Sequence, residues 1–209
     1  MVIGYEGDLR VMTRDDLYRH YRRHYHPGNA FIVSVGDFSA PELLGRIERA
    51  FGDIPPGELV PRDIGVTEPP QPGERRVEIR KPAGSPLFRV AFHAPAASSP
   101  DFVPLLVAEA VLSGGGGSMG RSSRLYRALV SSGLARGAGS DMSVTIDPNL
   151  FQVAVTGLPE SDLGQIERVV KHEIERLQAD AVPEAELDRA KRQLLAQLTY
   201  SAEGVTNQA

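Results

Sequence analysis

The stretch Tyr25-His-Pro-Gly-Asn-Ala-Phe-Ile-Val-Ser-Val-Gly-Asp37 joins a turn signal to a short apolar run. In the turn Pro27-Gly28-Asn29, Pro fixes φ, Gly permits a positive φ and Asn bonds to its own backbone. The β-branched run Ala30–Val35 predicts a buried strand, which Gly36 ends. Helical patterns precede and follow this run, so the sequence predicts a helix–strand–helix unit here.

The composition is that of a soluble globular protein. The chain has 209 residues, of which 41% are hydrophobic and 24% charged, with a net charge of −4. Lys and Arg gather in no segment, and no apolar run approaches the roughly 20 residues of a membrane span, so we expect neither a nucleic-acid partner nor a membrane partner. The absence of cysteine excludes disulfides and thiol catalysis. The first residues lack a signal-peptide pattern, which favours a cytoplasmic location over secretion without assigning a compartment.

Two helices are predicted in the first segment. One begins at Thr13 and carries a buried stripe of Leu17, Tyr21 and Tyr25, spaced four residues apart. The other begins at Ser39, whose spacing to Glu42 is that of a capping box, and ends at Gly52.

Asp16, His20 and His24 form a neighbouring stripe on the first helix, again with a spacing of four residues. This spacing is compatible with metal binding. The helix is also rich in Arg and His, and the sequence favours a solvated polar face over a metal site.

A proline-rich segment follows, because nine Pro and Gly residues fall in the stretch from Pro55 to Gly73. Such density prevents regular structure and indicates a semi-rigid connection. We read it as a domain boundary rather than a long loop within one domain. The predicted organisation is a first domain at 1–62, a linker at 63–74 and a second domain at 75–209.

The second segment alternates strands and helices. The pattern predicts strands at Arg76–Arg80, Leu87–His93, Met142–Ile146 and Phe151–Val155, and helices at Asp101–Leu112, from Ser122, at Leu163–Leu177 and from Pro183. The last two strands form a hairpin around Asp147-Pro148-Asn149. The loop Ser113–Gly120 is glycine-rich but lacks the Lys-Ser/Thr ending of a phosphate-binding loop, so a flexible loop is expected. His93 is expected to be structural.

The series of motifs along residues 3–55 resembles the pitrilysin/insulinase family of zinc metallopeptidases. The residues that carry the resemblance are Ile3-Gly4, Asp8-Leu9, Met12-Thr13, Leu17, Tyr21, Tyr25-His26-Pro27, Asn29-Ala30, Val35-Gly36-Asp37, Phe51-Gly52 and Pro55. They are similar to the second half of a family N-terminal domain. Residues 75–209 resemble most of the C-terminal, non-zinc domain of the same family.

The resemblance implies an α+β fold of two consecutive domains of mostly antiparallel sheet backed by helices, a metallohydrolase-like two-layer sandwich, with the first domain incomplete. The family's zinc motif, His-x-x-Glu-His, is absent from this chain. The nearest text, His172-Glu173-Ile174-Glu175-Arg176, has Arg where the unrelated His-Glu-x-x-His motif needs its second His, and we read it as a helix surface. Zinc is therefore expected only in the full-length parent, and this chain alone is expected to be inactive, with no catalytic or metal-binding residues.

The most specific piece of the resemblance is Ser123-Arg124-Leu125-Tyr126 followed by Gly133-Leu134-Ala135. In the family this region often carries an Arg and a Tyr that hold the substrate backbone. Arg124 matches that Arg and is the candidate substrate-binding residue. Arg136 stands where the family often has Tyr. The alternative role for Arg124 is to tie down the glycine-rich loop.

The resemblance implies that the chain is the non-catalytic portion of a zinc endopeptidase that forms part of a chamber for peptides or unfolded polypeptides. The alternative is part of an inactive family member that serves as a partner or structural subunit of a zinc-bearing peptidase. An incomplete sheet leaves an unpaired edge, which is a template for pairing. We therefore expect a homo-oligomer, associated through the first segment, or a heterodimer with a related peptidase subunit.

Overall fold

The structure is a computed structural model that describes residues 4–58, 70–115, 120–204 and 206. The chain divides into two compact units: unit 1, residues 1–76 with 205–209, and unit 2, residues 77–204. The division falls just after the predicted linker, of which 63–69 lie outside the described residues. The domain limits given above stay a prediction. No helix in the described ranges is both long enough and apolar enough to cross a bilayer.

Unit 2 is built on an antiparallel sheet with the strand order β1-β3-β2 in the described part of the chain. Its strands are β1 (Leu87–Ala94), β2 (Ala135–Met142) and β3 (Asn149–Gly157). Buried and partly exposed side chains alternate along the central strand β3. Its fully buried Val153 lies in register with Val90 of β1 and Ser140 of β2. Because side chains alternate between faces along a strand, this register places the apolar residues of all three strands on one side.

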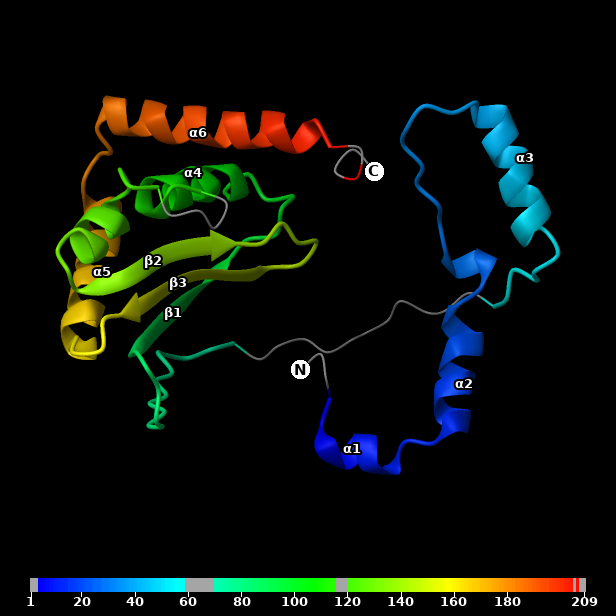
Figure 1. Cartoon of the computed structure of the whole chain (residues 1–209), viewed down its shortest axis with the longest axis horizontal. Coiled ribbons are helices and arrows are strands. Elements are labelled where there is room, and N and C mark those ends of the chain that lie inside the picture. Colours follow the sequence, from blue (N-terminus) through cyan, green and yellow to red (C-terminus); the bar gives the residue numbers. More distant parts are fainter. Residues whose placement is uncertain (1–3, 59–69, 116–119, 205, 207–209) are drawn as a thin grey trace. The chain divides into compact units, whose positions relative to one another are not determined.

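Helices cover that apolar side of the sheet (Figure 1). They are α4 (Phe102–Ser113), the π-helical segment η2 (Tyr126–Val130) and α5 (Leu163–Ala179). Leu129, Ile166 and Val170 are completely buried and meet Val153 in one core cluster. The predicted α+β class, an antiparallel sheet with helices on one face, is confirmed.

The long helix α6 (Glu184–Ala202) lies along α4 (Figure 1). Ala190 packs on Ala110 and Val111 in a second, smaller cluster, where small side chains allow close approach of the two helices. Farther along α6, the Gln197 side-chain amide donates to the Gly115 carbonyl at 3.2 Å. Helix α6 thus fastens the start of the glycine-rich loop to the domain. Residues 116–119 of that loop lie outside the described residues.

Unit 1 contains helices but almost no buried side chains among its described residues. Its elements are α1 (Glu6–Val11), α2 (Arg14–His24), the 3-10 turn η1 (Pro27–Asn29) and α3 (Ala40–Phe51). Helix α2 begins as predicted, since Thr13 and Asp16 form a reciprocal capping box. The predicted capping box of α3 is wrong: Ser39 is its N-cap residue, but the Ser39 side chain makes no capping hydrogen bond.

His26 is the one buried side chain among the described residues of unit 1. Its Nε2 lies 3.1 Å from the Arg23 carbonyl, so Nε2 carries the proton and donates. Gly57, at φ +70°, covers the ring so closely that a Cβ there would lie 2.5 Å from it. The Gly28 amide donates to the Pro56 carbonyl at 3.0 Å. The Tyr-His-Pro-Gly-Asn turn is therefore pinned to the segment that follows α3.

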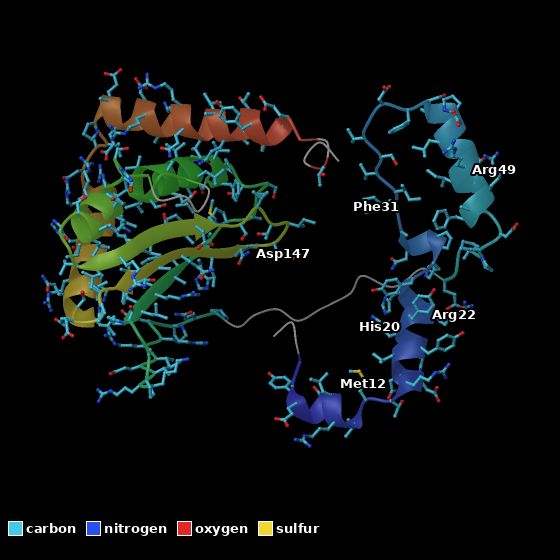
Figure 2. The ribbon with its side chains drawn as sticks, in the orientation of Figure 1. Met12, His20, Arg22, Phe31, Arg49 and Asp147 are labelled. Atoms are coloured by element: carbon cyan, nitrogen blue, oxygen red, sulfur yellow. The ribbon has the colours of Figure 1, made fainter. Side chains whose placement is uncertain are left out.

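Three predicted strands are wrong in place or existence. The run Ala30–Val35 is not a strand: no described residue pairs with it, and Phe31 is 90% exposed (Figure 2). Arg76–Arg80 is likewise not a strand, and its apolar side chains are exposed. The first hairpin strand occupies Ala135–Met142 instead of Met142–Ile146. A strand needs a partner ladder to satisfy its backbone, and alternation alone does not supply one.

The stripe predicted to be buried on α2 is also wrong. Leu17, Tyr21 and Tyr25 are between 53% and 68% exposed. Their spacing is helical, as predicted, and Tyr21 stacks on Tyr25 at 5.4 Å between ring centroids. The apolar face of α2 exists, but nothing in the described part of unit 1 covers it.

Candidate functional site

The most specific motif, Ser123-Arg124-Leu125-Tyr126, opens the helical turn that continues as η2. Leu125 and Leu129 are fully buried and anchor this turn in the core. Within η2 the Ser131 amide bonds the Tyr126 carbonyl at 2.9 Å, a spacing of five residues that marks a π-helix. The anchored turn holds Arg124 at a fixed place beside α6.

Arg124 is 6% exposed and makes a two-pronged ion pair with Glu186 of α6. Its Nε donates to Oε1 at 3.2 Å and its Nη2 to Oε2 at 2.8 Å. The hydrogen bond from Arg124 lowers the pKa of Glu186, and the same bond raises the pKa of Arg124. Arg127 adds a longer contact to Glu186 at 3.5 Å. Such a geometry compensates the cost of burying both charges.

An open recess of about 650 Å³ adjoins this pair. Its walls come from η2, α5, α6 and the connection between the two helices, and the lining residues are Arg124, Arg127, Ala128, Glu173, Arg176, Asp180, Ala181, Pro183 and Glu186. Three Arg and three acidic residues face one another there. The Glu173 carboxylate receives both of its bonds from Arg176 at 3.1 Å. The recess therefore offers hydrogen-bonding groups of both kinds without an excess of either charge.

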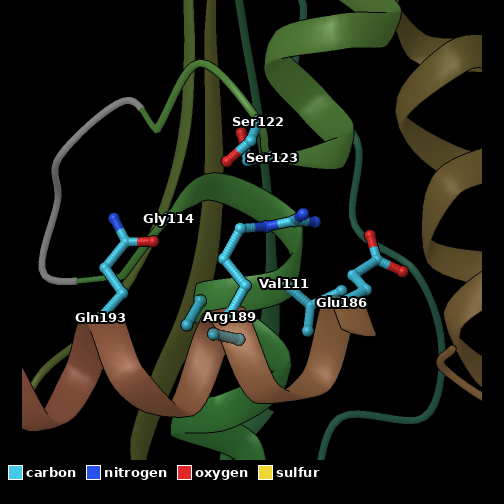
Figure 3. A pocket seen from close by; sticks show the side chains of 9 residues that line it. Val111, Gly114, Ser122, Ser123, Glu186, Arg189 and Gln193 are labelled. Carbon is cyan, nitrogen blue, oxygen red and sulfur yellow. The ribbon is translucent and has the colours of Figure 1, made fainter. Parts of the chain in front are cut away.

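A much smaller polar cavity lies where α6 meets the ends of the glycine-rich loop (Figure 3). Ser122 and Ser123 face Arg189 and Gln193 across it, with Glu186 at its edge. Its volume of about 10 Å³ corresponds to a single water molecule. The cavity is a joint between elements and is too small for a substrate.

The structure does not bring the two Arg residues of the motif into one ion-pair network. Arg136 is exposed at the irregularity in β2, where the register shifts between Ala135 and Gly137, and it forms no ion pair with any described residue. Among the described residues, Gln197 and the Gly120–Ser113 backbone bond hold the ends of the glycine-rich loop, and Arg124 bonds Glu186. Substrate binding by Arg124 stays a prediction.

The histidines of unit 2 lie apart from this cluster. His93 is exposed on the uncovered side of β1, and His172 is exposed on α5. Glu173, the neighbour of His172, is buried and accepts a hydrogen bond from Arg176. Only part of the segment His172–Arg176 is therefore helix surface. Nowhere in the described ranges do three or more His, Asp or Glu side chains gather as a metal site would need. The described residues therefore offer no three-ligand set for a catalytic zinc.

The centre of the sheet face opposite the helices of unit 2 is lined by small and polar side chains. On β3 these are Gln152, Ala154 and Thr156, all partly exposed, while the exposed Leu150 of β3 and Leu87 of β1 lie towards opposite ends of the same face. Gly139 of β2 and Arg89 of β1 flank Ala154 in register. No described helix of unit 2 packs on this face, and β1 has an unpaired outer edge within the described part of unit 2. An uncovered face beside an open edge accommodates an extended chain.

Sequence reasoning missed Glu186 and the buried serine pair. A buried Arg requires a carboxylate, and the acidic first turn after Pro183 was the available signal, although it does not single out Glu186 from Glu184. Ser140 donates to Ser113 at 2.8 Å and so ties β2 to α4. No local pattern indicates that bond.

A protein-family model described as "Peptidase M16 inactive domain" matches residues 12–194. Among curated proteins, the chain is 27% identical to a "Probable mitochondrial-processing peptidase subunit beta" of Schizosaccharomyces pombe, over 98% of this chain and 46% of that protein. It is 26% identical to "Zinc protease PqqE" of Helicobacter pylori, over 90% of this chain and 42% of the other. The chain thus spans about half the length of the curated relatives it matches.

Solved structures agree on the fold. A protease from Helicobacter pylori superposes with a TM-score of 0.84 at 24% identity, over 98% of this chain and 49% of that one. The resemblance to the pitrilysin/insulinase zinc metallopeptidases is confirmed by these matches.

Proposed function

The chain belongs to the peptidase M16 inactive-domain family, and we propose that it is the non-catalytic portion of a zinc endopeptidase, where it forms part of the chamber that receives peptides or unfolded polypeptides. The zinc belongs to the full-length parent in this proposal. The chain itself supplies a wall and no reacting group. The "zinc protease" name of the Helicobacter pylori relative supports a parent of this kind.

The observation that carries the proposal is the uncovered face of the β1-β3-β2 sheet. A sheet face that helices cover cannot receive a ligand, whereas the described helices of unit 2 cover only one face of its sheet. The other side presents Ala154 and Gly139 at its centre, with Arg89 and Gln152 beside them. Small side chains leave the backbone accessible, and the polar ones offer bonds to peptide groups of any sequence.

The predicted contact between Arg124 and a peptide carbonyl depends on the Nη1 atom of Arg124. The other two donor nitrogens of the guanidinium, Nε and Nη2, bond to Glu186, whereas Nη1 is buried without a hydrogen-bond partner among the described residues. A peptide that reached Nη1 would satisfy it. A charge-balanced recess suits a neutral carbonyl better than a charged ligand.

The test uses the natural gene product, its zinc content and its hydrolysis of a quenched fluorescent peptide. We expect about one zinc per chain and cleavage that a chelator abolishes. Ala154→Trp places a bulky side chain at the centre of the open sheet face and should raise KM with little change in kcat or zinc content. Ala196→Trp, the same change at an exposed position of α6, is the matched control. Equal kinetics for the two folded variants would refute the role of this face.

A second function, an inactive partner or structural subunit of a zinc-bearing peptidase, is favoured by unit 1. Its helices and the extended run Ala30–Val35 expose large apolar side chains along most of their length. Exposure on this scale is typical of a surface that another protein segment covers. The name of the Schizosaccharomyces pombe relative is that of a subunit.

The same zinc measurement separates the two functions. A gene product without zinc and without cleavage, which nevertheless restores activity to a zinc-bearing relative, would favour the second. In both cases the 209-residue chain alone should show no chelator-sensitive cleavage. Specific cleavage by that chain would contradict both.

A further inference from the structure

A pair of histidines on α2 is used by neither function. His20 and His24 are four residues apart, so they lie one turn apart on the same side of the helix. Their ring centroids are 4.3 Å apart with 34° between the ring planes. His20 is exposed, as Figure 2 marks it on α2, and His24 is half-buried. Neither ring makes a hydrogen bond with a described residue, so the ring nitrogens are available.

We propose that His20 and His24 form a two-ligand surface site for a divalent transition-metal ion, with Cu²⁺ bound more tightly than Ni²⁺ or Zn²⁺. Neutral imidazole suits these three ions, and at a site with no imposed geometry the affinity follows their intrinsic order. Both ring nitrogens must lie about 2.0–2.1 Å from the ion. Rotation of the exposed His20 and the half-buried His24 side chains brings the nitrogens to such an ion.

The charged neighbours of the pair explain why only two side chains are assigned. Asp16, one turn earlier, is already occupied: it accepts from the Thr13 hydroxyl at 2.6 Å and from Arg19 at 2.8 Å. It belongs to the helix cap and not to the metal site. The remaining coordination positions are left to water, so the site binds the ion reversibly.

The backbone that carries the pair is already ordered. His20 and His24 lie in the last turns of a helix that begins with its own capping box, which limits the entropy lost when the ligands are fixed.

The experiment is a calorimetric titration of the full 209-residue chain with CuCl₂, NiCl₂ and ZnCl₂ at neutral pH. The chain contains no Trp, so tyrosine fluorescence is a second readout: Cu²⁺ bound at the pair should quench Tyr21, which follows His20 directly. We expect one ion per chain, with affinity lowered by at least about tenfold in His20→Asn and in His24→Asn. His93→Asn and His172→Asn, which remove single histidines of unit 2, should leave it unchanged.

Hydrogen exchange provides a measurement that does not depend on the variants. Zn²⁺ should slow the exchange of amides in the second half of α2 and leave those of α3 unaffected. The proposal is overturned if the ions do not bind, if His20→Asn or His24→Asn binds as the parent chain does, or if protection does not change in α2.

Discussion

The two units show what local sequence can and cannot build. In unit 2, α4, α5 and η2 enclose a cluster that includes fully buried Leu129, Val153 and Ile166. In unit 1, α2 and α3 are equally regular, yet His26 is the one buried side chain among the described residues there. Helices form in both because their hydrogen bonds are internal. Among the described residues, strands form only in unit 2, because a strand needs a partner.

The same contrast applies to charge. Ion pairs of unit 1, such as Arg46 with Glu42 on α3, lie between exposed side chains and contribute little to stability. The pair of Arg124 with Glu186 in unit 2 is nearly buried, so losing one partner leaves a charge without compensation. Burial, rather than the residue types, sets the energetic weight of a contact.

The largest expected effect is a core truncation in unit 2. Leu129→Ala removes a fully buried side chain and should lower the free energy of unfolding by about 4 kcal/mol. Leu17→Ala, the same change on exposed α2, should cost about 0.5 kcal/mol or less. Urea unfolding followed by circular dichroism measures both. Similar losses of unfolding free energy in the two variants would mean that α2 is covered in solution. The contrast between a packed unit 2 and an exposed unit 1 would then be wrong.

The next effect is the loss of one partner of the buried ion pair. Arg124→Met leaves Glu186 without its main partner and should cost about 3 kcal/mol. Arg127→Met, on the half-exposed side chain 3.5 Å from the same carboxylate, should cost about 0.5 kcal/mol. If Arg124→Met is as mild as its control, the pair does not hold η2 to α6, and the case for Arg124 as a substrate contact is strengthened.

A smaller effect is the pH dependence that Glu186 imposes. Its folded pKa lies below the usual Glu value, so its stabilising contribution is complete above about pH 4.3 and is lost as the pH falls through the folded pKa. Between pH 5 and pH 3 the parent chain should therefore lose more stability than Glu186→Gln, which cannot titrate. Parallel stability curves for the two proteins would show that the pair is not formed in solution.

Much of unit 2 was predictable from periodicity. The 3.6-residue pattern located α4, α5 and α6, and alternation located β1 and β3, because most of each apolar face packs within the same unit, although Leu198 of α6 is exposed. The hairpin strand β2 was missed because Ala135–Met142 is rich in Gly and small polar residues. Its burial comes from Ala138 and Ser140 packing under helices, a tertiary effect with little local signal.

The candidate site was predictable only in part. The motif around Arg124 was recognisable, whereas Glu186 lies 62 positions away along the chain and has no periodic signature. In unit 1 the pattern of Ala30–Val35 predicted a strand, but the described residues contain no partner strand that forms a hydrogen-bond ladder with it. A local sequence pattern predicts which face of a segment is apolar. It does not predict which distant segment packs on that face.

The smallest expected change in stability tests the surface of unit 1 most directly. Phe31 is 90% exposed on an extended, unpaired run, so Phe31→Ser should alter the free energy of unfolding by less than about 0.5 kcal/mol. If unit 1 associates through this run, as we predict, the variant should nonetheless weaken self-association in sedimentation at high micromolar concentration. Ile146→Ser is the matched control, because Ile146 is 93% exposed in unit 2. A parent chain that stays a monodisperse monomer would contradict the prediction, and equal weakening by both variants would place the contact elsewhere than at Ala30–Val35.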